Sequence, residues 1–160
     1  MSWQDKPQVK KGDYGELLVR KYLEKKGWIV YQPITDGAHY FDILATLNKN
    51  QVVAIDVKTK GKMNLGAQGL DIKHYNQYLK FSKDTNIDFY LIFVDDKCGD
   101  VHACKISKLA NTKPKFQDKK IIAWDINIMT LVFNIGVKNC KILSQYDTRN
   151  YEYKGVSQNV

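Results

Sequence analysis

Two aspartates and one lysine stand out because they lie in otherwise apolar runs that resemble strands. Asp42 belongs to the run at residues 40–47, and the run at residues 51–58 contains Asp56 and ends in Lys58. Two converging carboxylates can hold a hard cation, and a nearby lysine can orient a water or stabilise developing negative charge. The simpler interpretation is an ion pair at the end of a sheet. These three residues alone leave both interpretations open.

The spacing predicts a hairpin that positions these groups. The turn at residues 48–50 contains two asparagines, which tolerate positive φ, and the second run is rich in β-branched residues. Side chains alternate along a strand, so Asp56 and Lys58 should lie side by side on one face of the sheet. The opposite face should carry Val53, Ile55 and Val57.

A helix is predicted from Asp13 to Lys26, with apolar residues at helical spacing and Gly27 after its end. This helix gives Glu16 two interpretations. It can form the second half of a capping box with Asp13, or it can point from the first turn toward the carboxylates across the sheet. The sequence leaves both open.

The remaining pattern predicts an α/β fold with a central mixed sheet flanked by helices. Residues 126–133 are ambiguous between helix and strand, and 61–69 reads as a glycine-rich loop. The other expected elements are strands at 28–34, 89–94 and 101–106, a helix at 71–83, a short helical turn capped by Ser107 and an edge strand at 121–125. We expect a flexible basic arm at 1–12, one domain at 13–143 and a polar tail at 144–160.

Composition narrows the class of protein. With 160 residues and 44% hydrophobic content, the chain can bury one sizeable core. No apolar run approaches the roughly 20 residues that span a membrane, and the first residues do not resemble a signal peptide. The three cysteines are odd in number and form no CxxC pair. These features predict a reduced, cytoplasmic protein without a membrane segment.

The formal net charge of +8 comes almost entirely from lysine, since Arg20 and Arg149 are the only arginines. Lysine suits phosphate contact, whereas arginine reads base edges better. A lysine surplus favours a polyanion that is bound through its backbone more than through its sequence. A merely solvated basic surface explains the same charge equally well.

Taken together, the pattern resembles the PD-(D/E)XK nuclease superfamily, whose core is a helix, a three-stranded meander, a second helix and a strand. Phe41-Asp42 stands in the place of the Pro-Asp pair, Asp56-Val57-Lys58 supplies the second half of the motif, and Glu16 matches a glutamate on the first helix. The resemblance covers residues 12 to about 106. Its departures are the missing proline and an aspartate where glutamate is commoner.

Within that superfamily, the layout is similar to archaeal-type Holliday junction resolvases and to small nucleases of phages and mobile elements. The resemblance implies a restriction-endonuclease-like fold and Mg²⁺-dependent hydrolysis of DNA by an endonuclease, with Mn²⁺ able to substitute. Asp42, Asp56 and the Val57 carbonyl would bind the metal together with Glu16, and Lys58 would orient the attacking water. The nucleic-acid backbone would be held by Lys60, Lys62, Lys73, Lys113, Lys115, Lys119 and Lys120.

The sequence also admits other functions. The same fold could be a non-catalytic module that binds nucleic acid or another partner, or an inhibitor or adaptor of a phage or mobile element. A homodimer is left open. Tyr75 or Tyr78 could line the site, although aromatic residues in a helical stripe more often belong to a core.

Overall fold

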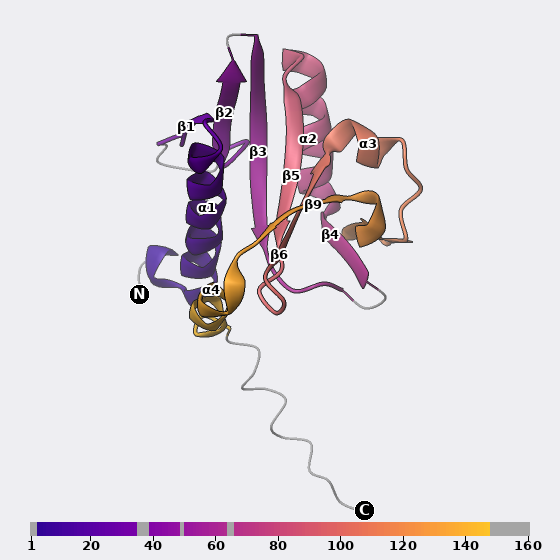
Figure 1. Cartoon of the computed structure of the whole chain (residues 1–160). Helices are drawn as coiled ribbons and strands as arrows, with labels where there is room; N and C mark the ends of the chain where they lie inside the picture. Colours follow the sequence, from indigo (N-terminus) through magenta and orange to yellow (C-terminus); the bar gives the residue numbers. More distant parts are fainter. Residues whose placement is uncertain (1–2, 35–38, 49, 64–65, 148–160) are drawn as a thin grey trace, which may run out of the picture.

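A six-stranded mixed sheet lies at the centre of the structure, with helices packed on its faces (Figure 1). The computed structural model describes residues 3–34, 39–48, 50–63 and 66–147. The helices are α1 (Pro7–Lys25), α2 (Ile72–Thr85), α3 (Ile106–Ala110) and α4 (Gly136–Ser144), with 3₁₀ turns η1 (Trp3–Asp5) and η3 (Ile126–Ile128). The strands are β1 (Ile29–Tyr31), β2 (Ile43–Asn48), β3 (Gln51–Thr59), β4 (Ala67–Asp71), β5 (Asp88–Val94), β6 (Asp100–Lys105), β7 (Phe116–Gln117), β8 (Ile121–Asp125) and β9 (Thr130–Asn134).

The order of the central sheet is β1-β2-β3-β5-β6-β9. β1, β2 and β3 form an antiparallel meander, and β3 pairs in parallel with β5, which is antiparallel to β6. A parallel pair needs a crossover connection, and α2 lies in the connection between β3 and β5. This arrangement confirms the predicted mixed sheet with flanking helices.

The two faces of β3 enter separate hydrophobic clusters, as its alternating side chains predict. Val53, Ile55 and Val57 pack with Val19 and Leu23 of α1, among others. On the other face, Ala54 packs with residues of α2, α3 and β8. Asp56 therefore points toward α2, while α1 covers the opposite face.

Helix α1 begins earlier than the sequence predicted, at Pro7. Proline is well suited to the first turn of a helix because it has no N–H to leave unpaired there. The buried residues of α1 are Lys11, Gly15, Val19 and Leu23, spaced by four along one stripe that faces the sheet. The expected boundary at Asp13 was wrong, and part of the expected basic arm is helical. Asp13 does not cap the helix, so the capping-box interpretation of Glu16 does not apply.

Three short strands form a second sheet, in the order β4-β8-β7. Part of the predicted glycine-rich loop is strand β4, and β8 is the middle strand of this sheet, so both predictions were wrong in detail. Gly69 of β4 has no room for a side chain, because a Cβ there would collide with Ile122 and Ala123 of β8. The close contact between the two backbones explains why a glycine-rich segment forms a strand here.

The later elements follow the prediction in part. Residues 126–133, which were ambiguous, form η3 and most of β9. Ser107 lies within α3, and the residue at the cap position is Lys105, which makes no side-chain capping bond. Most of the expected polar tail lies outside the described residues, and α4 ends at Ser144. Across the described part of the chain, no helix is both long and apolar enough to cross a membrane.

Candidate active site

Asp42 lies immediately before β2 and is fixed against β3 by hydrogen bonds. Its own N–H donates to the Ile55 carbonyl at 2.9 Å, and the Val57 N–H donates to Asp42 Oδ2 at 2.7 Å. The other carboxylate oxygen, Oδ1, lies 3.2 Å from Nε2 of His39. The strand pairing therefore places Asp42 beside the Asp56-Val57-Lys58 triplet.

Asp56 and Lys58 lie side by side near the end of β3, as predicted, and α2 adds a third group. The Lys58 ammonium lies 2.7 Å from Asp56 Oδ2, and the Tyr78 hydroxyl donates to Asp56 Oδ1 at 2.7 Å. The Lys58 Nζ atom also lies 3.4 Å from the Tyr78 hydroxyl oxygen. The Asp56 side chain is only 6% exposed, so these neighbours decide how its charge is balanced.

Glu16 lies well inside α1, and it belongs to the same electrostatic group. Burial raises its pKa to about 8, with further contributions from Asp42, Asp13 and Asp56, while Lys58 opposes the shift. Burial and the neighbouring Asp56 raise the pKa of Asp42 to about 6, against the effects of the Val57 N–H and Lys58. Asp42, Asp56 and Lys58 thus meet at one end of the β2–β3 hairpin, and Glu16 of α1 is near enough for the charges of all three to act on its pKa.

The fold around this cluster is shared with a solved resolvase structure. A solved structure of Hjc from Archaeoglobus fulgidus, a Holliday junction resolvase from an archaeal hyperthermophile, matches with a TM-score of 0.58 at 14% identity, covering 84% of this chain and 96% of that one. The chain has a restriction-endonuclease-like fold. The bacterial homing endonuclease I-Ssp6803I matches with a TM-score of 0.46 at 15% identity, covering 71% of each chain. No protein-family model and no curated protein matches this sequence.

The acidic residues of the candidate active site are of the type that binds a hard divalent cation. Asp42, Asp56 and Glu16 offer oxygen ligands, and the raised pKa values of Asp42 and Glu16 reflect burial and repulsion that a cation would relieve. Asp56 Oδ2 receives no hydrogen bond within the described part of the chain, despite its contact with Lys58. Among the described residues, no three His, Cys, Asp or Glu side chains form a ready-made metal-binding group. A cation would therefore have to draw these side chains together.

Three of the lysines predicted to bind nucleic acid have partners inside the protein. The Lys60 ammonium donates to the Gly69 carbonyl of β4. Lys62 Nζ lies 3.7 Å from Asp95 Oδ2, and Lys115 Nζ lies 2.7 Å from Asp125 Oδ2. These contacts explain the positions of the three lysines without any role in binding nucleic acid.

The other predicted lysines are exposed and lie on two neighbouring elements. Lys73 is in the first turn of α2, and the Ile72 N–H at the start of that helix donates to the Lys120 carbonyl at 2.8 Å. Lys113, Lys119 and Lys120 are exposed around β7. The second sheet therefore brings part of the basic loop beside the N-terminus of α2, where the helix dipole also favours anions.

Two further residues lie near the carboxylates: Tyr78, which the sequence offered only as an alternative to a core position, and His39, which was not predicted to belong to the site. Tyr78 shares its helical stripe with Tyr75, and the sequence does not show that Tyr75 packs on Trp124 while Tyr78 reaches Asp56. His39 precedes Asp42 by three residues, and residues 35–38 before it lie outside the described part of the chain. Spacing alone could not separate a core tyrosine from one that contacts a carboxylate.

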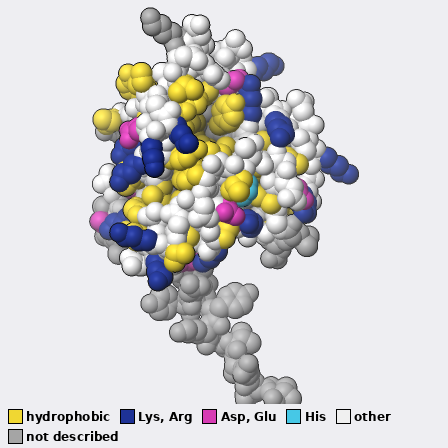
Figure 2. All heavy atoms as spheres, viewed as in Figure 1, with side chains coloured by type: hydrophobic (Ala, Val, Ile, Leu, Met, Phe, Trp, Pro, Cys, Tyr) yellow, Lys and Arg dark blue, Asp and Glu magenta, His cyan; other side chains and the backbone are white. Residues whose placement is uncertain are grey.

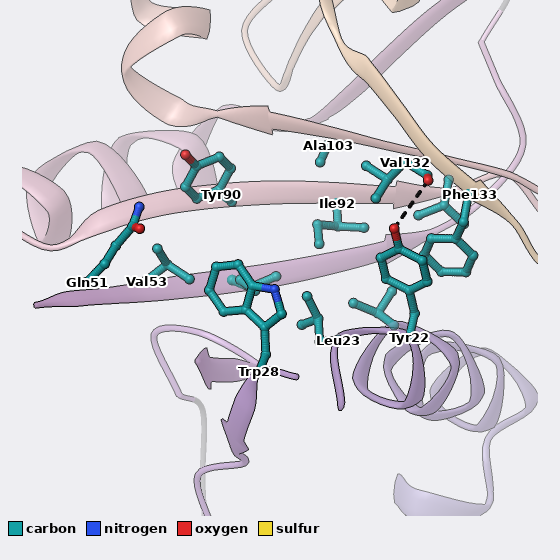
Figure 3. Close-up of a pocket in the computed structure, with 13 residues that line it drawn as sticks. Tyr22, Leu23, Trp28, Gln51, Val53, Tyr90, Ile92, Ala103, Val132 and Phe133 are labelled. Carbon is teal, nitrogen blue, oxygen red and sulfur yellow. Dashed lines mark hydrogen bonds between the residues drawn. The ribbon is translucent and has the colours of Figure 1, made fainter. Parts of the chain in front are cut away.

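An apolar cavity of about 280 Å³ lies elsewhere, between α1 and the strands β3, β5, β6 and β9 (Figure 3). Its lining includes Tyr22, Trp28, Val53, Ile92 and Phe133. Apolar side chains gather in a hollow on this face, with Lys and Arg side chains around it (Figure 2). Val53 and Ile55 line the cavity from the face of β3 opposite to Asp56, so the cavity is separate from the candidate active site.

Proposed function

We propose that this protein is a divalent-cation-dependent nuclease that hydrolyses phosphodiester bonds in DNA. The main support is that Asp42, Asp56 and Lys58 lie together at the end of the β2–β3 hairpin in a restriction-endonuclease-like fold, with Glu16 of α1 in electrostatic range of them. Raised carboxyl pKa values and a buried, charged side chain are frequent at functional sites. The match to a resolvase structure supports the proposal that the activity is that of an endonuclease.

In this proposal, Asp42, Asp56 and Glu16 hold Mg²⁺ together with the Val57 carbonyl, and Mn²⁺ can replace it. The cation supplies charge neutralisation at the phosphate and a more acidic bound water. Lys58 contributes a positive charge that orients the attacking water and offsets charge developing on the phosphate. The Val57 N–H holds Asp42 Oδ2 in place throughout, because it belongs to the backbone of β3.

A cleavage assay on linear, single-stranded and branched DNA, with matching RNA, tests this proposal. Mg²⁺, Mn²⁺ and EDTA should separate cation-dependent turnover from background. Lys58→Ala should abolish turnover, whereas Lys105→Ala should leave it unchanged. Lys105 is a fair control because it also pairs with one aspartate, Asp88, at 2.7 Å, but on the exposed surface of β6. Equal loss in both variants, or turnover in EDTA, would contradict the proposal.

The second candidate function is a nucleic-acid-binding module without catalysis. It is favoured by the Lys58–Asp56 ion pair, since this pair already neutralises one aspartate without a cation. Such a module would bind DNA equally well in EDTA and would cleave none of the substrates tested. The homodimer and the cytoplasmic location remain predictions, and sedimentation of the purified chain would test the first.

The basic surface can be tested separately from catalysis. Binding to DNA should weaken as salt rises, because lysines that contact phosphates release condensed counterions. Reversing the charge of the exposed Lys113, Lys119 and Lys120 should lower affinity and flatten the salt slope by roughly one unit for each lysine that no longer neutralises a phosphate. Lys115→Glu is the matched control, since Lys115 already pairs with Asp125. Unchanged affinity at low salt would show that these lysines are only a solvated surface.

A further inference from the structure

Each aspartate of the candidate active site has one oxygen held by a hydrogen-bond donor of the protein. For Asp42 the donor is the Val57 N–H, which reaches Oδ2. For Asp56 it is the Tyr78 hydroxyl, which reaches Oδ1, and this leaves Oδ2 toward Lys58. The hydrogen bond to Asp56 comes from a side chain, so substitution of Tyr78 can remove it.

The Tyr78 ring is held by the same sheet that carries Asp56. Tyr78 is 5% exposed and stacks on Phe89 of β5, with ring centroids 4.6 Å apart and planes 15° from parallel. Phe89 is fully buried and stands in register with Ala54 of β3. A hydroxyl fixed in this way holds Asp56 in one orientation, so little reorganisation is needed when the site acts.

Tyr78 also contacts Lys58. The Lys58 Nζ atom lies 3.4 Å from the Tyr78 hydroxyl oxygen and 5.9 Å from the ring centroid, within the range of a cation–π contact. A tyrosine hydroxyl keeps its proton at neutral pH, so it remains a donor to Asp56 Oδ1. One side chain of α2 therefore contacts both Asp56 and Lys58 of the Asp56-Val57-Lys58 triplet.

We propose that Tyr78 is a positioning residue that gives the two oxygens of Asp56 separate tasks. Its hydroxyl holds Oδ1, so that Oδ2 stays turned toward Lys58 and the cation. This inference rests on the proposed nuclease function and adds a residue to its site. The competing explanation is that Tyr78 only fills the core between α2 and β5, as Tyr75 does beside Trp124.

Tyr78→Phe separates the two explanations because it removes the hydroxyl and keeps the ring. Tyr75→Phe is the matched control, since it makes the same change in another buried tyrosine of α2. Loss of a group that supports a metal ligand typically costs about 10–100-fold. We expect about that fall in kcat for Tyr78→Phe, with KM for DNA unchanged, and a change of less than about twofold for Tyr75→Phe.

A second measurement does not depend on cleavage. Calorimetric titration of the resting protein with Mn²⁺ should show about 10–100-fold weaker binding for Tyr78→Phe than for Tyr75→Phe. Tyr78→His, which retains a ring N–H donor, should lie between Tyr78→Phe and the unsubstituted chain. Thermal unfolding of each variant checks that the protein is folded under the assay conditions.

The outcomes separate this inference from the proposed function. If the unsubstituted chain cleaves DNA and the two Phe variants behave alike, the role assigned to Tyr78 is wrong and the nuclease proposal stands. If the chain cleaves no substrate but its Mn²⁺ affinity depends on the Tyr78 hydroxyl, the nuclease proposal is wrong and the positioning role stands.

Discussion

Two groups of aspartates and lysines lie near the ends of the neighbouring parallel strands β3 and β5, and they differ in charge balance. The first is the candidate active site on β3. The second, the matched cluster, consists of Asp95 and Asp96 after β5, Lys11 of α1 and Lys62. Both groups remove carboxylates from solvent, so burial alone does not distinguish them.

In the matched cluster every aspartate has its own lysine. Lys11 forms an ion pair with Asp96, with side chains 7% and 1% exposed, and Lys62 Nζ lies 3.7 Å from Asp95 Oδ2. Asp95 Oδ1 also accepts hydrogen bonds from the N–H groups of Lys97 at 2.9 Å and Cys98 at 3.2 Å. Each aspartate charge is thus paired with a lysine charge, although both Asp96 oxygens lack a hydrogen bond within the described part of the chain. The cluster ties α1 to the turn after β5.

In the candidate active site, Lys58 faces Glu16, Asp42 and Asp56, and the excess negative charge helps to raise the pKa of Glu16 and Asp42. Paired charges need no further ion, whereas the surplus carboxylates of the candidate active site would be balanced by the cation that we propose. The comparison therefore supports a cation at the candidate active site and not at the matched cluster.

The strongest test of this difference is to remove one carboxylate from each group. Asp56→Asn should reduce cleavage by about 10⁴-fold or more while DNA binding stays intact or tightens, because the lost charge carries the cation and otherwise repels phosphate. Asp96→Asn should leave the turnover of the folded fraction unchanged. Single-turnover cleavage and binding at equal concentrations of folded protein measure both. Undiminished turnover in Asp56→Asn would remove Asp56 from the mechanism.

For stability we expect the opposite: the matched cluster should contribute more to the free energy of unfolding than the candidate active site. Lys11→Met removes one partner of a buried pair and leaves Asp96 charged, which should lower the free energy of unfolding by about 3–5 kcal/mol. Lys58→Met should lower it much less, since the Lys58 side chain is 27% exposed and its loss leaves Asp56 with the Tyr78 hydrogen bond. Urea denaturation gives both values. A larger loss for Lys58→Met would reverse the assignment of the two groups.

Helix α1 contributes Lys11 to the matched cluster and Glu16 to the candidate active site, and Gly15 lies between these two residues in the sequence. A Cβ on Gly15 would collide with the Thr59 side chain, so the helix packs directly against the end of β3. Gly15→Ala should lower the free energy of unfolding by about 1–3 kcal/mol through overpacking. Thr59→Ala in the same chain should recover part of that loss, as thermal unfolding of the single and double variants would show. No recovery would mean that the close packing at Thr59 is not the cause.

The smallest expected effect is on pH dependence. Folding raises the pKa of Glu16 from 4.5 to about 8, so the folded state binds its proton more tightly than the unfolded state. The associated stability is fully present below about pH 4.5 and is lost as pH rises through about 8. Glu16→Gln should remove this pH-dependent loss of stability. After discounting for partial exposure of Glu16, the loss in the free energy of unfolding is about 1 kcal/mol, which corresponds to roughly 2–4 °C in melting temperature near pH 8. Melting curves from about pH 5 to 8.5 without divalent cations test it, and parallel curves for both chains would contradict it.

The sequence predicted those features that depend on local periodicity. Alternation along β3 placed Asp56 and Lys58 on one face, and the apolar run at residues 89–94 correctly indicated a strand that is covered on both sides. The hairpin pairing also brought Asp42 to the triplet. These features need only neighbours along the chain or the next strand.

The features that were missed depend on distant partners. The sequence predicts a flexible arm around Lys11 because its partner, Asp96, lies far along the chain in the turn after β5. It predicts a loop in place of strand β4 because the closeness of β8 to Gly69 cannot be deduced from the glycine itself. Tyr78 resembles a core residue because the carboxylate that it contacts lies on another element.

The pairing of β4 with β8 has a consequence for the order of folding. In this pair Ala67 stands opposite Asp125, and the bond from Ile72 N–H to the Lys120 carbonyl ties the start of α2 to the same late segment. Closing so long a loop costs chain entropy, so such contacts form slowly compared with the β2–β3 hairpin. The hairpin that carries Asp42, Asp56 and Lys58 can therefore assemble early, whereas the helix that brings Tyr78 to Asp56 gains its final anchor late. A nascent chain can thus form the hairpin that carries Asp42 and Asp56 before the Tyr78 hydroxyl fixes the orientation of Asp56.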